Sequence, residues 1–126
     1  MKIEDLVGGR ITAMNDNGLT VLHDGVLYFI RLDETPDEFL DCCGYNEWDI
    51  VHEPIDFEDN FITAIDVVED ESDWSYYLEL RVFTNIKAFE ARGEAGSGSG
   101  WDYGQSVSIR LSKLDANNVE EVIDER

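Results

Sequence analysis

The sequence predicts one α+β domain, a mostly antiparallel sheet of six or seven strands with one short helix packed on it. Apolar and polar residues alternate in several runs, most clearly from Trp74 to Val82, which is the period of a strand with one buried face. Asn-Gly and Asp-Gly dipeptides separate the earlier runs and favour tight hairpin turns. A helix-start signature at Thr35 predicts the helix. The domain spans residues 1–126, close to the commonest domain length.

The first third of the chain predicts a three-stranded meander. Residues 10–14 and 19–23 form two strands around residues 15–18 (Asn-Asp-Asn-Gly), where Asn-Gly suits the positive φ angles of a type I′ turn. Residues 24–25 (Asp-Gly) make a second tight turn into a strand over residues 26–32. Two dipeptide turns therefore connect three neighbouring antiparallel strands.

A short helix is predicted over residues 35–43. Thr35 can cap its first turn, Pro36 suits a position that needs no N–H, and Glu38 completes a capping box. Gly44 is a natural stop. The apolar face of this helix consists of Phe39, Leu40, Cys42 and Cys43. The two cysteines are adjacent and poorly placed to bridge each other, so a disulfide-stapled secreted scaffold is not expected.

The second half of the chain predicts further strands. Residues 48–55 contain Pro54 and form an edge strand or an extended connector. Residues 61–68 form a strand, and the acidic residues 69–73 make a solvated turn into the strand that starts at Trp74.

The last strands enclose a glycine-rich loop. Two alternating runs, residues 89–92 and 107–111, flank a loop from Gly93 to Gly104 that presents Trp101 and Tyr103. The chain then becomes polar, and residues 115–126 are predicted to form a frayed tail.

Charge restricts the possible partners. The chain has 9 basic and 29 acidic residues, a net charge of −20 and a pI near 4.1. Nucleic acid, membrane headgroups and free phosphate all require cations on the protein and are not expected to bind. A basic protein surface or a cation fits better, and simple solubility is the alternative explanation. No signal peptide or apolar run of membrane-spanning length occurs, which predicts a cytoplasmic protein.

No catalytic or metal-binding pattern stands out, and neither an enzyme nor a cofactor is predicted. Cys42 or Cys43 could pair with His23 or His52, but a reactive thiolate needs positive surroundings and these are acidic. The acidic run after His52 could gather a cation, although such runs are usually solvated faces.

Three segments resemble a family of small, uncharacterised bacterial and phage proteins, classed as a domain of unknown function. These are residues 6–11 (Leu-Val-Gly-Gly-Arg-Ile), residues 41–43 (Asp-Cys-Cys) and the glycine- and tyrosine-containing loop that leads into Ser106-Val107. The loop is longer and richer in glycine than the family pattern, and the sequence after Cys43 departs from it. The resemblance implies no activity. It implies a phage or prophage setting, which favours a protein that interferes with host machinery.

The acidic surface then suggests a function. Carboxylates two apart on a strand lie about 6.6 Å from each other and point the same way, a spacing comparable with that of phosphates along a nucleic-acid strand. We predict a non-catalytic inhibitor that mimics a polyanion and binds the basic surface of a host CRISPR effector or restriction nuclease. Trp48, Tyr77 and Phe83 would add aromatic anchors. The predicted contact residues are Glu53, Asp56, Glu58, Asp59, Glu69, Asp70, Glu71, Asp73, Glu79, Glu90, Glu94, Trp101 and Tyr103.

Two alternatives remain open. Arg92 and Arg110 flank the glycine loop, and with Trp101 they could bind a nucleotide and sequester it. Against this, the arginines could simply neutralise nearby glutamates. The other alternative is an immunity protein against a basic nuclease toxin, which would use the same electrostatics as the polyanion mimic.

Overall fold

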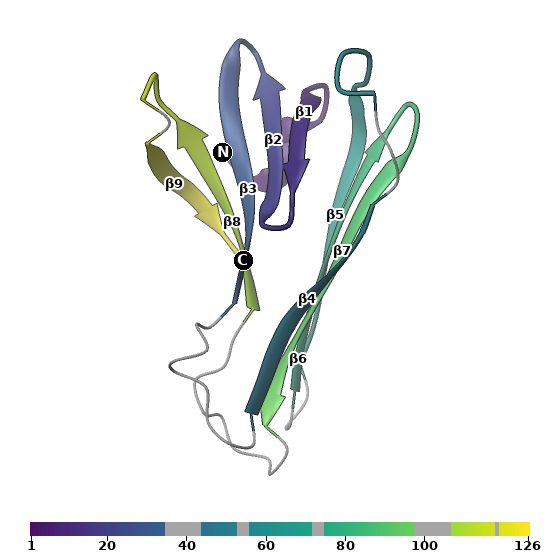
Figure 1. The fold of residues 1–126 in the computed structure, drawn as a ribbon, viewed down its shortest axis with the longest axis vertical. Coiled ribbons are helices and arrows are strands. Elements are labelled where there is room, and N and C mark those ends of the chain that lie inside the picture. The colour runs from purple at the N-terminus through teal and green to yellow at the C-terminus, as the bar shows by residue number, and fades with distance from the viewer. Residues whose placement is uncertain (35–43, 53–55, 72–74, 98–106, 118) are drawn as a thin grey trace.

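The computed structural model describes residues 1–34, 44–52, 56–71, 75–97, 107–117 and 119–126. These residues form two antiparallel sheets that face each other, as Figure 1 shows. The first sheet has the order β1-β2-β3-β8-β9 and consists of β1 (Arg10–Asn15), β2 (Gly18–His23), β3 (Val26–Glu34), β8 (Val107–Leu114) and β9 (Glu120–Glu125). The second sheet has the order β4-β7-β6-β5 and consists of β4 (Gly44–His52), β5 (Ile62–Glu71), β6 (Ser75–Thr84) and β7 (Ala88–Ser97).

The predicted α+β class is wrong. The described residues contain a single helical turn, the 3₁₀ helix η1 (Ile3–Leu6), and otherwise form strands and their connections. Each sheet has one apolar face, and the two apolar faces cover each other, so the fold does not need a helix to bury a sheet. The helix predicted for residues 35–43 lies outside the described residues.

The core lies between the sheets. Alternate residues on the central strands of both sheets are fully buried, as are both apolar residues of η1. Apolar burial of this kind is the main driving force that holds such a sandwich together. The fully buried side chains include Ile3, Leu6, Leu19, Val21, Ile30, Leu78, Leu80, Val82, Phe89, Ile109 and Leu111.

The predicted meander is confirmed, with one correction to its turns. β1, β2 and β3 are consecutive antiparallel neighbours. The two positive φ angles of a type I′ turn occur at Asp24 (51°) and Gly25 (78°), not at the Asn-Gly turn. In the Asn-Gly turn only Gly18 has a positive φ angle, and a Cβ atom at this position would overlap the carbonyl oxygen of Ile30. Glycine is therefore required at position 18 for close approach to β3.

Three segments predicted as irregular belong to strands. Glu69–Glu71, expected in a solvated turn, extend β5 and pair with β6. Gly93–Ser97, expected in the glycine loop, extend β7; all five pair with β4, and all but Ser97 also pair with β6. Residues 120–125, expected in a frayed tail, form β9 on β8. In each case a neighbouring strand supplies backbone hydrogen bonds that the composition of the segment does not reveal.

Candidate acidic interface

The outer face of the second sheet is lined with carboxylates. Alternation along each strand sends every second side chain outward, and the antiparallel register aligns these side chains in rows. In one row Glu47 on β4 lies directly opposite Glu94 on β7. Tyr77 on β6 and Asp70 on β5 continue the same row. The outward-facing acidic residues of this sheet are Glu47, Asp49, Asp66, Asp70, Glu79, Glu90 and Glu94.

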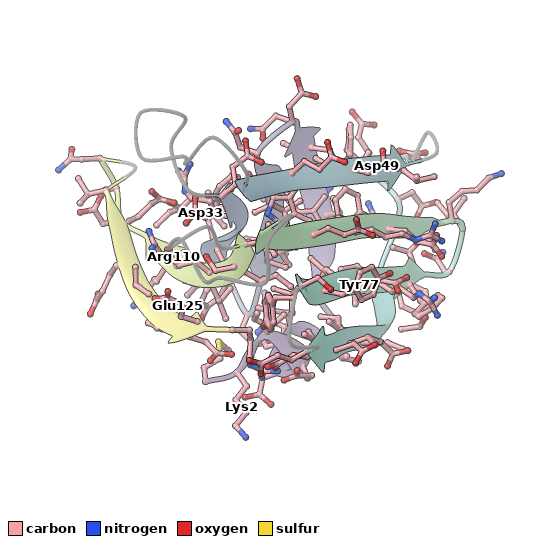
Figure 2. The ribbon with its side chains drawn as sticks, turned by 90° about the horizontal axis from the view of Figure 1, so that it is seen from below. Lys2, Asp33, Asp49, Tyr77, Arg110 and Glu125 are labelled. Atoms are coloured by element: carbon pink, nitrogen blue, oxygen red, sulfur yellow. The ribbon has the colours of Figure 1, made fainter. Side chains whose placement is uncertain are left out.

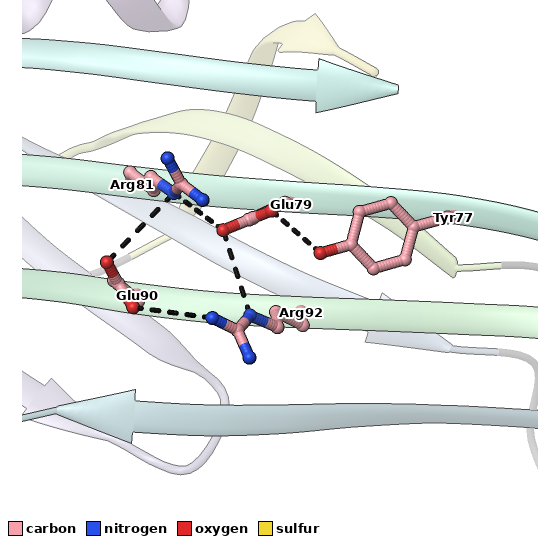
Figure 3. Close-up of polar contacts among 5 residues, drawn as sticks. All are labelled: Tyr77, Glu79, Arg81, Glu90 and Arg92. Carbon is pink, nitrogen blue, oxygen red and sulfur yellow. Dashed lines mark hydrogen bonds and ion pairs between the residues drawn. The ribbon is translucent and has the colours of Figure 1, made fainter. Parts of the chain in front are cut away.

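A charge cluster occupies the centre of this face (Figure 3). Glu79 is only 4% exposed and accepts a 2.6 Å hydrogen bond from Nε of Arg81 and a 2.7 Å bond from the hydroxyl of Tyr77. Nε of Arg92 lies 3.8 Å from the same carboxylate. Glu90 lies 4.0 Å from Arg81 and 3.9 Å from Arg92. Arg81 and Arg92, the only cations on the described strands of this sheet, are therefore both engaged by Glu79 and Glu90.

The cluster shifts the protonation equilibria of its members. The hydrogen bond from Tyr77 and the contacts with Arg81 and Arg92 hold the pKa of Glu79 below its ordinary value, against the opposing effect of burial. The same bond to Glu79 raises the pKa of Tyr77, and Glu79 also raises the pKa of Arg81. Glu79 is thus a charged but internally satisfied group, poorly placed to contact a partner.

The outer carboxylates differ from Glu79. Each of them is exposed, and none forms an ion pair within the described part of the chain, although Asp49 lies directly opposite Arg92 and Asp66 directly opposite Arg81. Like charges directly opposite on neighbouring strands, such as Glu47 and Glu94, repel each other. We call the five residues of this set, which form no ion pair within the described residues, the acidic rim: Glu47, Asp49, Asp66, Asp70 and Glu94.

Only part of the predicted contact set reaches this face. Asp70 and Glu94 lie in the acidic rim, and Glu79 and Glu90 lie in the central cluster. Sequence reasoning missed Glu47, Asp49 and Asp66, although Asp49 and Asp66 each lie between two apolar residues of their strand. The predictions at Glu53, Asp73, Trp101 and Tyr103 fall outside the described residues.

The other predicted acids lie elsewhere. Asp56, Glu58 and Asp59 are exposed in the turn before β5, where Oδ1 of Asp56 accepts the backbone N–H groups of Glu58 (2.9 Å) and Asp59 (3.3 Å). Glu69 and Glu71 face the opposite side of β5, next to Tyr76, whose pKa is raised by burial and by the charge of both glutamates. The carboxylates of these five residues are exposed, but they do not line up in a row on the outer face of the second sheet.

The predicted aromatic anchors also change role. Trp48 turns inward, donates its indole N–H to the carbonyl oxygen of Asp33 (2.7 Å) and packs on Gly93 of the neighbouring strand. It therefore joins the two sheets and does not serve as a surface anchor. Tyr77 is committed to Glu79. Phe83 is half-buried on the outer face, between Ala64 and Ala88.

The two arginines of the nucleotide alternative lie on different sheets. Arg92 belongs to the central cluster of the second sheet. Arg110 projects from the first sheet, 3.3 Å from Asp33 and 3.9 Å from Glu125. Figure 2 shows Asp33, Arg110 and Glu125 together, apart from Tyr77 and Asp49 of the second sheet. The described residues do not bring Arg92 and Arg110 into one site.

Comparison with known proteins found no match among family models, curated proteins or solved structures. In the described residues no helix has the length and apolar composition needed to span a bilayer. The same residues contain no group of three or more histidine, cysteine, aspartate or glutamate side chains arranged to hold a metal ion.

Proposed function

We propose that this protein is a non-catalytic inhibitor whose acidic rim occupies the basic nucleic-acid-binding surface of a host defence protein. The observation that supports this is the separation of charges on the second sheet. The two arginines form their ion pairs with Glu79 and Glu90 at the centre, while the five exposed carboxylates of the rim form none within the described residues. A basic groove would supply cations to the rim and relieve the repulsion between Glu47 and Glu94.

We also propose the class of protein that is the target. A CRISPR effector or a restriction nuclease has a basic groove of this kind, and the setting would be the cytoplasm of a host cell infected by a phage or carrying a mobile element. An immunity protein against a basic nuclease toxin would use the same rim. No contact among the described residues favours the nucleotide-sequestering alternative.

The test measures binding to a panel of nucleic-acid-free effectors, restriction nucleases and basic nuclease toxins. We expect a bound target to be displaced by DNA, and the affinity to fall about tenfold or more between about 50 and 200 mM NaCl. Glu47→Lys combined with Glu94→Lys should weaken binding about tenfold or more. The matched control combines Asp16→Lys with Glu121→Lys, which changes net charge equally at exposed positions of the first sheet and its turn.

Either of two results would contradict the proposal. One is binding that DNA does not displace and salt does not weaken. The other is an equal loss of affinity in the rim variant and in the control, because net charge alone would then explain the interaction.

A further inference from the structure

The four edge strands of the two sheets are not equally available to a partner. In β1, Asn60 satisfies both backbone groups of Ile11, with hydrogen bonds of 2.9 and 2.8 Å. In β9, Glu120 pairs with Arg31, and Asp124 pairs with Arg126 and accepts the backbone N–H of Ile3. Asn60 therefore already occupies part of the β1 edge, and Arg31 and Arg126 neutralise two of the acids of β9. The two edges of the second sheet are β4 and β5. β4 carries two acidic residues, whereas β5 carries four.

On the side that faces away from β6, the backbone of β5 is hydrogen-bonded to other described residues only at its first residue. At Ile62 the backbone N–H donates to Gly9 (2.7 Å) and the carbonyl accepts from Gly8 (2.8 Å), so this edge already accepts strand-like hydrogen bonds. From Ala64 to Glu71 every residue is in register with β6. On the side away from β6, these eight residues have no backbone hydrogen bond within the described chain.

The charge on this free stretch selects the kind of strand that can be added. Four of its eight residues are acidic and none is basic; these acids are Asp66, Glu69, Asp70 and Glu71. None of the four forms an ion pair within the described residues, and only Asp66 lies directly opposite a basic residue, Arg81. A second copy of β5 would place acids beside acids, which disfavours self-pairing. A basic segment would instead gain backbone hydrogen bonds and charge neutralisation together.

The outward positions of β5 specify the pattern of that segment. Asp66 and Asp70 flank Val68 on the outer face, and Val68 is 42% exposed. The two carboxylates are four residues apart, a separation of about 13 Å along a strand. We propose that β5 captures an extended segment of the target by strand addition, with basic residues at the two positions beside Asp66 and Asp70 and an apolar residue between them. This inference rests on the proposed function and names the element of the target that the acidic face would engage.

The test uses a synthetic peptide, Lys-Lys-Lys-Val-Thr-Lys-Thr-Thr, which matches Glu71 to Ala64 in antiparallel register. We expect it to bind the full chain and to slow hydrogen exchange about tenfold or more at the amides of residues 64–71 that point away from β6. The same peptide with its valine and first threonine replaced by proline keeps the charge but lacks two N–H donors. It should bind more weakly and leave these amides unprotected.

A pair of protein variants separates strand addition from general attraction. Asp66→Lys combined with Asp70→Lys should abolish the protection, whereas the control, Asp16→Lys combined with Glu121→Lys, should retain it. Peptide binding without protection of residues 64–71, or no peptide binding, would overturn strand addition. Neither result would contradict the proposed inhibitor function, because that function is tested separately, with folded target proteins and substitutions at Glu47 and Glu94.

Discussion

At the scale of single residues, Glu79 shows how the protein retains a buried charge within a highly acidic chain. Its carboxylate faces outward from the sheet, yet Tyr77, Arg81 and Arg92 surround it and leave it 4% exposed. A buried carboxylate is costly unless its hydrogen-bonding capacity is filled. The two arginines therefore form their ion pairs inside the cluster and form none with the acidic rim in the described part of the chain.

Glu79→Gln keeps the side-chain shape and removes the charge, and we expect it to lower the free energy of unfolding by about 1–2 kcal/mol at pH 7. Because the folded pKa of Glu79 lies below its ordinary value of 4.5, its contribution is present above that value and is lost as pH falls through the lower folded value. Urea denaturation should therefore show a constant difference from pH 7 to about 5 that shrinks below about 4.

Glu90→Gln is the comparison variant, because the contacts of Glu90 with the two arginines are longer, at 3.9 and 4.0 Å. It should cost less than Glu79→Gln at neutral pH. A Glu79→Gln difference that persists unchanged to pH 3 would show that the loss comes from packing and not from charge.

At the scale of elements, the edge of β1 depends on one side chain from a distant segment. Asn60 is 6% exposed, donates to the carbonyls of Ile11 (2.8 Å) and Asp56 (2.7 Å), and accepts the N–H of Ile11 (2.9 Å). The asparagine thus completes the β1 edge as a short strand would, and it fixes the turn that leads into β5.

Asn60→Ala should lower the free energy of unfolding by about 2–3 kcal/mol, since three hydrogen bonds at about 1 kcal/mol each are lost. Asn60→Asp retains the shape and the acceptor but has no N–H to donate, so it should be nearly as damaging. Thermal or urea unfolding measures both. Full stability in Asn60→Asp would show that the two donated bonds contribute nothing.

At the scale of the whole molecule, net charge opposes folding. A chain of 126 residues with a charge of −20 repels itself, and the acidic rim and the β5 and β9 edges concentrate that repulsion. The same charges protect the sheet edges from pairing with other copies. Solubility and resistance to aggregation therefore come at some cost in stability.

Added salt should stabilise the protein. Between about 10 mM and 0.5 M NaCl the screening length falls from about 30 Å to below 8 Å, and we expect the melting temperature to rise by about 5 °C, the equivalent of roughly 1 kcal/mol. Differential scanning calorimetry at both concentrations measures the change. A melting temperature that falls with salt would mean that internal ion pairs, such as Arg126 with Glu4, outweigh the repulsion.

Sequence patterns located most of the strands because alternation and turn dipeptides are local properties. The runs around Leu78, Ile30 and Ile109 are strands with buried apolar faces, as predicted. The extensions of β5 and β7 were not predictable in the same way. Glu69–Glu71 and Gly93–Ser97 have the composition of turns and loops, and only a neighbouring strand makes them extended.

The acidic character of the candidate interface was predictable from the sequence, but the residues that form it were not. The sequence by itself determined the strong negative charge, the alternating strands and the outward placement of residues such as Glu79 and Glu90, because these follow from composition and a period of two. Tertiary structure decided that the strands divide into two sheets, that Glu79 is internally neutralised and that Glu47 joins Glu94 at the rim. Those outcomes depend on which distant strands pair and in which register, and register is a property of the assembled sheet.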